Sequence, residues 1–113
     1  MPKYLWQTSY TAEGFKGLLR EGASSRVAYM RDLFEKGGGK LEAMYWAFGD
    51  SDVYMIGEVA DNVAAAAPSM AVSASGAGHV TTVVLLTPEE IDAAAKLEGG
   101  YRALEGGYRA PGA

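Results

Sequence analysis

A turn signal near the middle of the chain constrains the fold most strongly. It reads Gly49-Asp50-Ser51-Asp52, and Gly and Asp tolerate the backbone angles that a short hairpin needs. Strand-forming residues dominate the runs on either side, residues 40–48 and 53–59. We therefore predict two antiparallel neighbouring strands joined by a tight turn. A positive φ at Gly49 is expected, so Gly49→Val should damage folding more than Ser51→Ala.

A strand and a broken helix are predicted before this hairpin. Residues 3–11 are rich in aromatic and β-branched side chains and predict the first strand. Thr11 is suited to cap the helix that follows. Gly22 interrupts the helical pattern, which resumes and ends at Gly37-Gly38-Gly39.

A second helix and a last strand follow the hairpin. Asp61 begins an Ala-rich helix that runs to Ser75, and Pro68 inside it should remove a hydrogen bond and kink or weaken it. Residues 79–86 predict the fourth strand. Thr87-Pro88-Glu89-Glu90 combines a capping Thr, a first-turn Pro and a capping-box Glu, which predicts a short helix through Lys96.

This order of elements predicts an α+β domain with the ferredoxin-like βαββαβ topology and an extra C-terminal helix. Right-handed crossovers would give an antiparallel four-stranded sheet, with the first and third strands central and both main helices on one face. We assign residues 1–97 to this domain and residues 98–113 to an irregular tail. In that tail, residues 98–103 (EGGYRA) recur at 105–110, and paired glycines oppose a helix. The tail either docks by its tyrosines or is a duplicated peptide without a role.

The predicted strands are apolar on both faces. The second strand sets Leu41, Ala43 and Tyr45 against Met44 and Trp46, whereas a one-sided sheet should alternate apolar and polar residues. One helix layer can cover only one face, so we predict a homo-oligomer, a dimer or higher, that pairs its sheets. An aspartate at Val84, taken as an inward position, should dissociate or unfold it.

Composition excludes several classes of partner and chemistry. The net charge of −4 argues against a nucleic-acid surface. The absence of cysteine removes disulfides, thiolate metal sites and cysteine nucleophiles. No apolar run reaches the ~20 residues of a membrane helix, and the start lacks a signal-peptide pattern, so we expect a cytoplasmic protein without a membrane partner.

Several motifs together resemble the bacterial GYD-domain proteins. They are the run Phe48-Gly49-Asp50-Ser51-Asp52, residues 39–43 before it and Leu86-Thr87-Pro88-Glu89-Glu90 near the end. The resemblance implies a dimeric α+β barrel and a family largely of unknown function. Ser51 stands where that family usually has Tyr.

A looser resemblance links the chain to the effector-binding domain of leucine-responsive regulators. It rests on the turn at Gly49, on Asp61 and on Gly78-His79-Val80-Thr81-Thr82. That likeness implies loops that meet at a subunit interface and hold small amino acids.

Large amphipathic aromatics are the best candidates for a ligand site, since the chain has 7 Tyr and 2 Trp. We predict that the aromatic wall of a pocket between sheet and helices includes four of them, with His79 near its rim: Trp6, Tyr10, Trp46 and Tyr54. The alternative is that these rings fill the core or an interface. Asp50 and Asp52 could bind a cation or an amine, but turn hydrogen bonds are their more usual role.

These observations lead to three hypotheses about function. The first is a small-molecule-binding or accessory protein for a small apolar or aromatic molecule or an amino acid, with no cofactor and no metal. The second is a cofactor-free enzyme, a monooxygenase or isomerase, with His79, Glu42 and Glu58 as acid–base candidates. The third is a purely structural oligomer. The scarcity of acid–base groups favours binding.

Overall fold

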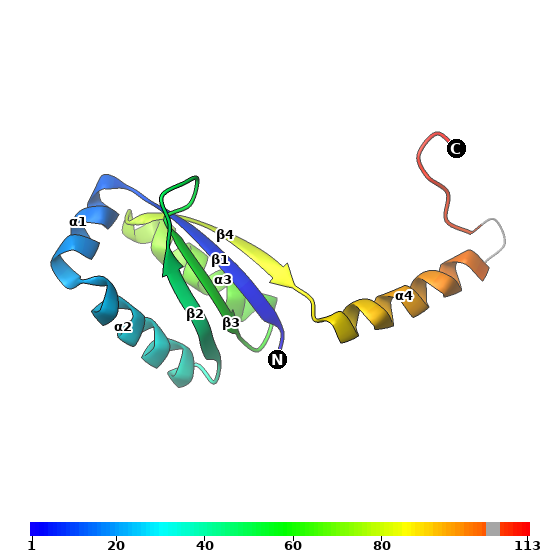
Figure 1. Ribbon diagram of the computed structural model, residues 1–113, viewed down its shortest axis with the longest axis horizontal. Helices are drawn as coiled ribbons and strands as arrows, with labels where there is room; N and C mark the ends of the chain where they lie inside the picture. Colours follow the sequence, from blue (N-terminus) through cyan, green and yellow to red (C-terminus); the bar gives the residue numbers. More distant parts are fainter. Residues whose placement is uncertain (104–106) are drawn as a thin grey trace.

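The computed structural model of the protein describes residues 1–103 and 107–113 (Figure 1). Four strands and four helices follow one another along the chain: β1 Lys3–Tyr10, α1 Ala12–Glu21, α2 Ala23–Lys36, β2 Lys40–Trp46, β3 Val53–Glu58, α3 Asn62–Ser75, β4 Gly78–Leu85 and α4 Pro88–Ala103. The sheet order is β2-β3-β1-β4 with every pair antiparallel. The predicted ferredoxin-like fold is therefore confirmed, including the central position of β1 and β3.

The caps foreseen from the sequence explain where the helices begin. The Thr11 hydroxyl accepts a hydrogen bond from the Gly14 amide, and the Asp61 carboxylate accepts one from the Ala64 amide. Between α1 and α2 the chain turns at Gly22, whose φ of +89° is open to glycine and rarely to other residues. α3 runs unbroken through Pro68.

The core lies between the sheet and the helices. Tyr4 and Trp6, neighbours on the helix side of β1, are 1% and 0% exposed. The Trp6 ring packs edge-on against Phe34 of α2, with 5.3 Å between ring centroids. Its indole N–H donates to the carbonyl of Ala65 on α3 at 3.0 Å. One residue thus connects the sheet to both helices.

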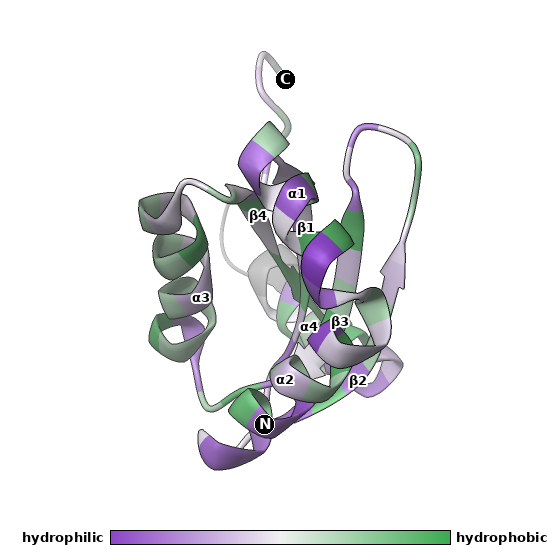
Figure 2. Cartoon of the chain, turned by 90° about the vertical axis from the view of Figure 1, so that its left-hand side faces the viewer, coloured by the Kyte–Doolittle hydropathy of each residue, from purple (hydrophilic) through white to green (hydrophobic). Residues whose placement is uncertain are grey.

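α2 and α3 cover opposite halves of this face (Figures 1 and 2). α2 packs mainly on β2 and α3 mainly on β4. α3 is apolar on its outer side as well (Figure 2), where Val63 and Met70 are 79% and 73% exposed.

The other face of the sheet carries no helix and will be called the open face. Strand register places one apolar row across all four strands, Ala43–Ile56–Leu5–Val83. A charged row built on Lys40, Glu58 and Lys3 borders it on one side, and a row built on Tyr45, Tyr54, Gln7 and Thr81 on the other. The open face is therefore apolar in one band, which is narrower than the apolar second face predicted from the sequence.

Two local features explain why the band is narrow. β1 alternates cleanly, with Tyr4, Trp6 and Thr8 buried and Lys3, Leu5, Gln7 and Ser9 on the open face. In β2 a register shift between Leu41 and Ala43 turns Leu41 to the helix side, where it is 4% exposed. Val84 lies opposite Tyr4 on the helix side at an edge strand, so Val83 is the position that faces outward.

The connection between β2 and β3 is a six-residue loop, not a tight hairpin. The Ala47 amide donates to the Asp52 carbonyl at 2.9 Å, and the tip of the loop projects past the ends of the strands (Figure 1). Gly49 has no positive φ, and a Cβ added there would meet nothing within 4 Å. The expected strain at Gly49 was wrong, because the longer loop reaches across without left-handed backbone at that position.

α4 differs from the prediction for the tail. It begins at the foreseen capping box, in which Thr87 and Glu90 exchange backbone and side-chain hydrogen bonds. It continues past Lys96 to Ala103, through Gly99 and Gly100, because each glycine costs only about 1 kcal/mol in a helix. The irregular segment expected from residue 98 is thus helical to 103, and residues 104–106 lie outside the described part.

α4 points away from the remainder of the domain (Figure 1), and its residues through Gly100 are exposed. Tyr108, beyond it, is 78% exposed. Of the two alternatives for the tail, docking by its tyrosines is not seen at Tyr108.

Candidate functional site

Two cavities lie between α2 and α3 above the helix side of the sheet, and both are bounded by Met30. We call them together the interhelical groove. The larger, about 320 Å³, has an apolar lining from the facing sides of the two helices: Met30, Leu33, Phe34, Gly37, Val59, Ala64, Ala67, Pro68 and Ala71. This volume is at the lower end of the ~300–1,000 Å³ typical of small-molecule sites.

The smaller cavity of the groove, about 90 Å³, lies nearer α1 and is more polar. Thioether and aliphatic groups form much of its lining, from Met30, Met44, Val53, Met55 and Val72. Thr8, Tyr10 and Arg26 add two hydroxyl groups and a guanidinium group. At Met30 an apolar cavity thus adjoins one that has hydrogen-bond donors.

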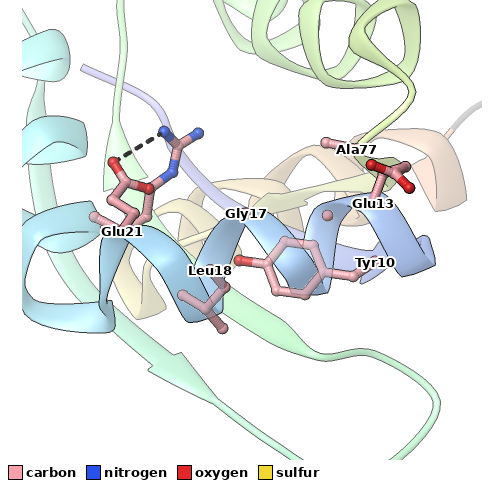
Figure 3. Close-up of a pocket in the computed structure, with 8 residues that line it drawn as sticks. Tyr10, Glu13, Gly17, Leu18, Glu21 and Ala77 are labelled. Carbon is pink, nitrogen blue, oxygen red and sulfur yellow. Dashed lines mark ion pairs between the residues drawn. The ribbon is translucent and has the colours of Figure 1, made fainter.

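A neighbouring cavity of about 180 Å³ along α1 shares Tyr10, Arg26 and Ala77 with the groove. Figure 3 shows the Tyr10 ring in it, with Leu18 nearby, Glu13 toward one end and Glu21 toward the other. Arg26 lies 3.8 Å from Glu21, measured from Nη1 to Oε1. Acidic and basic groups therefore meet where this cavity adjoins the groove.

The predicted aromatic wall is divided between the two faces of the sheet. Trp6, Tyr10 and Trp46 are on the helix side, whereas Tyr54 and His79 are on the open face, opposite Gln7 and Ser9. Of the five, Tyr10 lines the groove, and Trp6 is sealed in the core beneath it.

Trp46 packs against the core, but its indole N–H is buried without a hydrogen-bond partner in the described part of the chain. An unpaired buried donor costs about 1–3 kcal/mol.

Sequence reasoning missed most of the groove's lining. Met30 and Phe34 share a helical face, a spacing that is typical of core residues and does not indicate a groove. Pro68 drew attention only as a helix breaker, yet it lines the groove. Arg26 is followed by Arg31, Asp32 and Glu35, a pattern typical of a solvated helix face. A pattern within one helix does not reveal what the facing helix contributes.

The acid–base candidates do not line the groove. The Lys3 ammonium group lies 2.8 Å from Glu42 Oε1 and donates a hydrogen bond to Glu42 Oε2 at 3.0 Å, and this hydrogen bond raises the pKa of Lys3 above its usual 10.5. Glu58 is opposite Lys3 and Lys40 in the strand register. Within residues 1–103 and 107–113, no cluster of three or more His, Asp or Glu side chains could hold a metal ion.

The turn motif holds its own loop in place. The Asp52 carboxylate accepts from the Tyr10 amide at 2.8 Å, and the Asp52 amide donates to the Thr8 carbonyl. The Ser9 hydroxyl donates to the Asp50 carbonyl at 2.9 Å. Asp52 therefore fastens the loop to the end of β1, the structural role weighed for this motif, and thereby fixes two strand residues that line the groove.

The fold and the groove define the class of protein: a ferredoxin-like α+β domain with an apolar space between its two main helices. The family model of the GYD domain matches residues 4–95. The chain therefore belongs to the GYD domain family, whose function is unknown. Comparisons with curated proteins and with solved structures gave no match. The likeness to leucine-responsive regulators remains one of short motifs.

In the portion of the chain that the structure describes, no helix is both long enough and apolar enough to cross a membrane.

Proposed function

We propose that the protein binds a small apolar molecule in the interhelical groove. The observation that carries this proposal is the larger cavity, about 320 Å³, whose lining from α2 and α3 is apolar. The groove is open to solvent, since Leu33 in its lining is 47% exposed, so a bound apolar molecule would cover apolar side chains that water now reaches. Burial of an apolar ligand there would be favourable at roughly 25 cal/mol per Å² of apolar area, before association costs.

We propose further that the binding unit is a homo-oligomer that pairs its open faces. The support is the apolar row Ala43–Ile56–Leu5–Val83 and the exposure of Tyr45, 72%, beside it. Such pairing would leave the groove accessible, since the groove lies on the opposite side of the sheet. Sedimentation at micromolar concentration should show a dimer or larger species, and a well-folded monomer throughout would contradict this part.

Titration with the neutral apolar fluorophore N-phenyl-1-naphthylamine tests ligand binding directly. We expect saturable enhancement of its fluorescence, together with a change in tryptophan emission because Trp6 packs on Phe34 of the groove wall.

Two neighbouring alanines of α3 provide a matched pair of variants. Ala67 lines the interhelical groove, whereas Ala66 lines a separate cavity of about 280 Å³ between α3 and β4. Ala67→Leu should weaken fluorophore binding by filling the groove, while Ala66→Leu should leave binding unchanged. The reverse pattern would move the site to the α3–β4 cavity. No saturable binding, with self-association intact, would leave a purely structural oligomer.

A further inference from the structure

The charge in the interhelical groove is confined to one end. Among the residues that line its two cavities, Arg26 is the only one with a charged side chain, and it lies at the end near α1. An apolar wall cannot compensate a charge on a ligand. The position of this single cation therefore decides which charged group a bound molecule can carry, and where.

The guanidinium group of Arg26 is available to a ligand. Its distance of 3.8 Å to Glu21 exceeds hydrogen-bond length. It also lies 4.9 Å from the centre of the Tyr29 ring, a contact that leaves the in-plane N–H groups unused. In the described part of the chain those N–H groups donate no hydrogen bond.

Two hydroxyl groups at the same end are also without partners. Thr8 is only 8% exposed and lines the smaller cavity, yet its hydroxyl makes no hydrogen bond to any described residue. The same holds for the Tyr10 hydroxyl, whose ring is held edge-on against Phe15 at 5.1 Å. Neither hydroxyl oxygen is cut off from solvent, because among the described residues Trp46 Nε1 is the one buried polar side-chain atom without a partner, so both hydroxyls are open to water or to a ligand in the cavity. This end of the groove therefore has unused hydrogen-bonding capacity beside a cation.

We propose that the ligand of the interhelical groove is an amphipathic monocarboxylate. Its hydrocarbon or aromatic body lies between α2 and α3, and its carboxylate pairs with Arg26 and accepts from the hydroxyls of Tyr10 and Thr8. The planar guanidinium matches a carboxylate with two parallel hydrogen bonds. This inference rests on the proposed function and adds the chemical class of the ligand.

The surrounding charges favour a single negative charge on the head group. Glu21 lies beside Arg26, and Glu13 lines the adjoining cavity (Figure 3). Like charges nearby raise the cost of an additional anion. A dianionic phosphate monoester is therefore disfavoured relative to a carboxylate with the same body.

Displacement of N-phenyl-1-naphthylamine by four ligands with one common tail tests the proposal. The competitors are octanoate, 1-octanol, octylamine and octyl phosphate. We expect octanoate to displace the fluorophore at a concentration about tenfold lower than 1-octanol, since hydrogen bonds to charged groups are the stronger ones. Octyl phosphate should displace the fluorophore less effectively than octanoate, and octylamine should be the weakest of the four competitors.

Variants of the ion pair assign the preference to Arg26. The measured quantity is the ratio of the octanol to the octanoate displacement constant, which cancels changes in fluorophore affinity. Arg26→Gln should reduce this ratio from about ten to near one. Glu21→Gln, which removes the competing carboxylate, should raise it a few-fold. Circular dichroism establishes that each variant is folded. Arg26→Lys keeps the positive charge but cannot form the two parallel hydrogen bonds of a guanidinium, so its ratio of octanol to octanoate displacement constants should be intermediate.

The outcomes separate this inference from the proposed function. One outcome is that the fluorophore binds while wild-type protein prefers octanoate no more than 1-octanol, or while Arg26→Gln keeps the preference. Either result would show that the ligand is not recognised as a carboxylate through Arg26, and the proposal that the groove binds an apolar molecule would be retained. If the fluorophore does not bind at all, the proposed function fails and this inference fails with it.

Discussion

The two faces of the sheet are built from alternate residues of the same strands, yet they differ in how deeply their side chains are buried. On the helix side Trp6 is fully buried and is linked to both α2 and α3. On the open face its chain neighbour Leu5 is only partly covered, in a row with Ile56 and Val83. The comparison teaches that strand composition alone does not define a core. The layer packed on each face does.

The largest expected effect comes from the helix side. Trp6→Ala should lower the free energy of unfolding by about 3–5 kcal/mol, because it leaves a cavity beneath both helices. Leu5→Ala, one residue away, should cost about 1 kcal/mol in dilute protein and more at concentrations where open faces pair. Urea denaturation at two protein concentrations measures both. Equal losses would show that the faces do not differ as described.

A charge on the open face should break self-association without unfolding the chain. Ile56→Asp would bury an unpaired carboxylate in a face-to-face pair, at about 3 kcal/mol or more, so association should weaken at least a hundredfold. Val63→Asp is the matched control, since Val63 is 79% exposed on α3, away from that face. Sedimentation equilibrium that shows the same weakening in both variants would refute pairing through the open face.

Two glycines contrast the packed side with the free loop. At Gly57 an added Cβ would lie 2.9 Å from the Phe34 ring and 2.7 Å from the Lys40 carbonyl. Gly57→Ala should therefore cost about 1–3 kcal/mol through overpacking. Gly49→Ala should have no measurable effect, because nothing lies within 4 Å of its added methyl group. Thermal melts that rank the two variants in the opposite order would contradict the described packing.

The smallest expected effect concerns the charged row of the open face. The hydrogen bond from Lys3 to Glu42 raises the lysine pKa above 10.5 in the folded state. Its contribution to stability is therefore fully present below about pH 10.5 and is lost as the pH rises through the folded-state pKa. Glu42→Gln should flatten this alkaline loss slightly.

Denaturation at pH 8 and at pH 11.5 measures that change. Asp32→Asn, which removes the partner of Lys36 on α2, should act independently because the two pairs share no residue. If wild type and Glu42→Gln lose the same free energy of unfolding between these two pH values, the Lys3–Glu42 pair does not contribute to the pH dependence of stability.

Local patterns determined the elements of this protein. Glycines and caps fixed where helices begin and end: Thr11, Gly22, Asp61 and Thr87 act where the sequence placed them. The number and order of strands followed from short-range signals, and from these the ferredoxin-like topology was predicted, because few connections of such elements are sterically allowed. The motif resemblance to GYD-domain proteins was confirmed over residues 4–95.

Tertiary structure alone decided the phase of β2, the extent of α4 and the composition of the groove. A bulge between Leu41 and Ala43 reverses which side chains of β2 meet the core, and the residue types in this stretch do not indicate a bulge. Tyr54 and His79 fell on the opposite face from Trp6 because strand register, not residue type, assigns a face. The groove unites residues of α2 and α3 that are far apart in the sequence, so no single-helix pattern could place Arg26 beside Thr8 and Tyr10. Local propensity acts over a few residues, whereas a site between packed layers depends on contacts that only the folded chain makes.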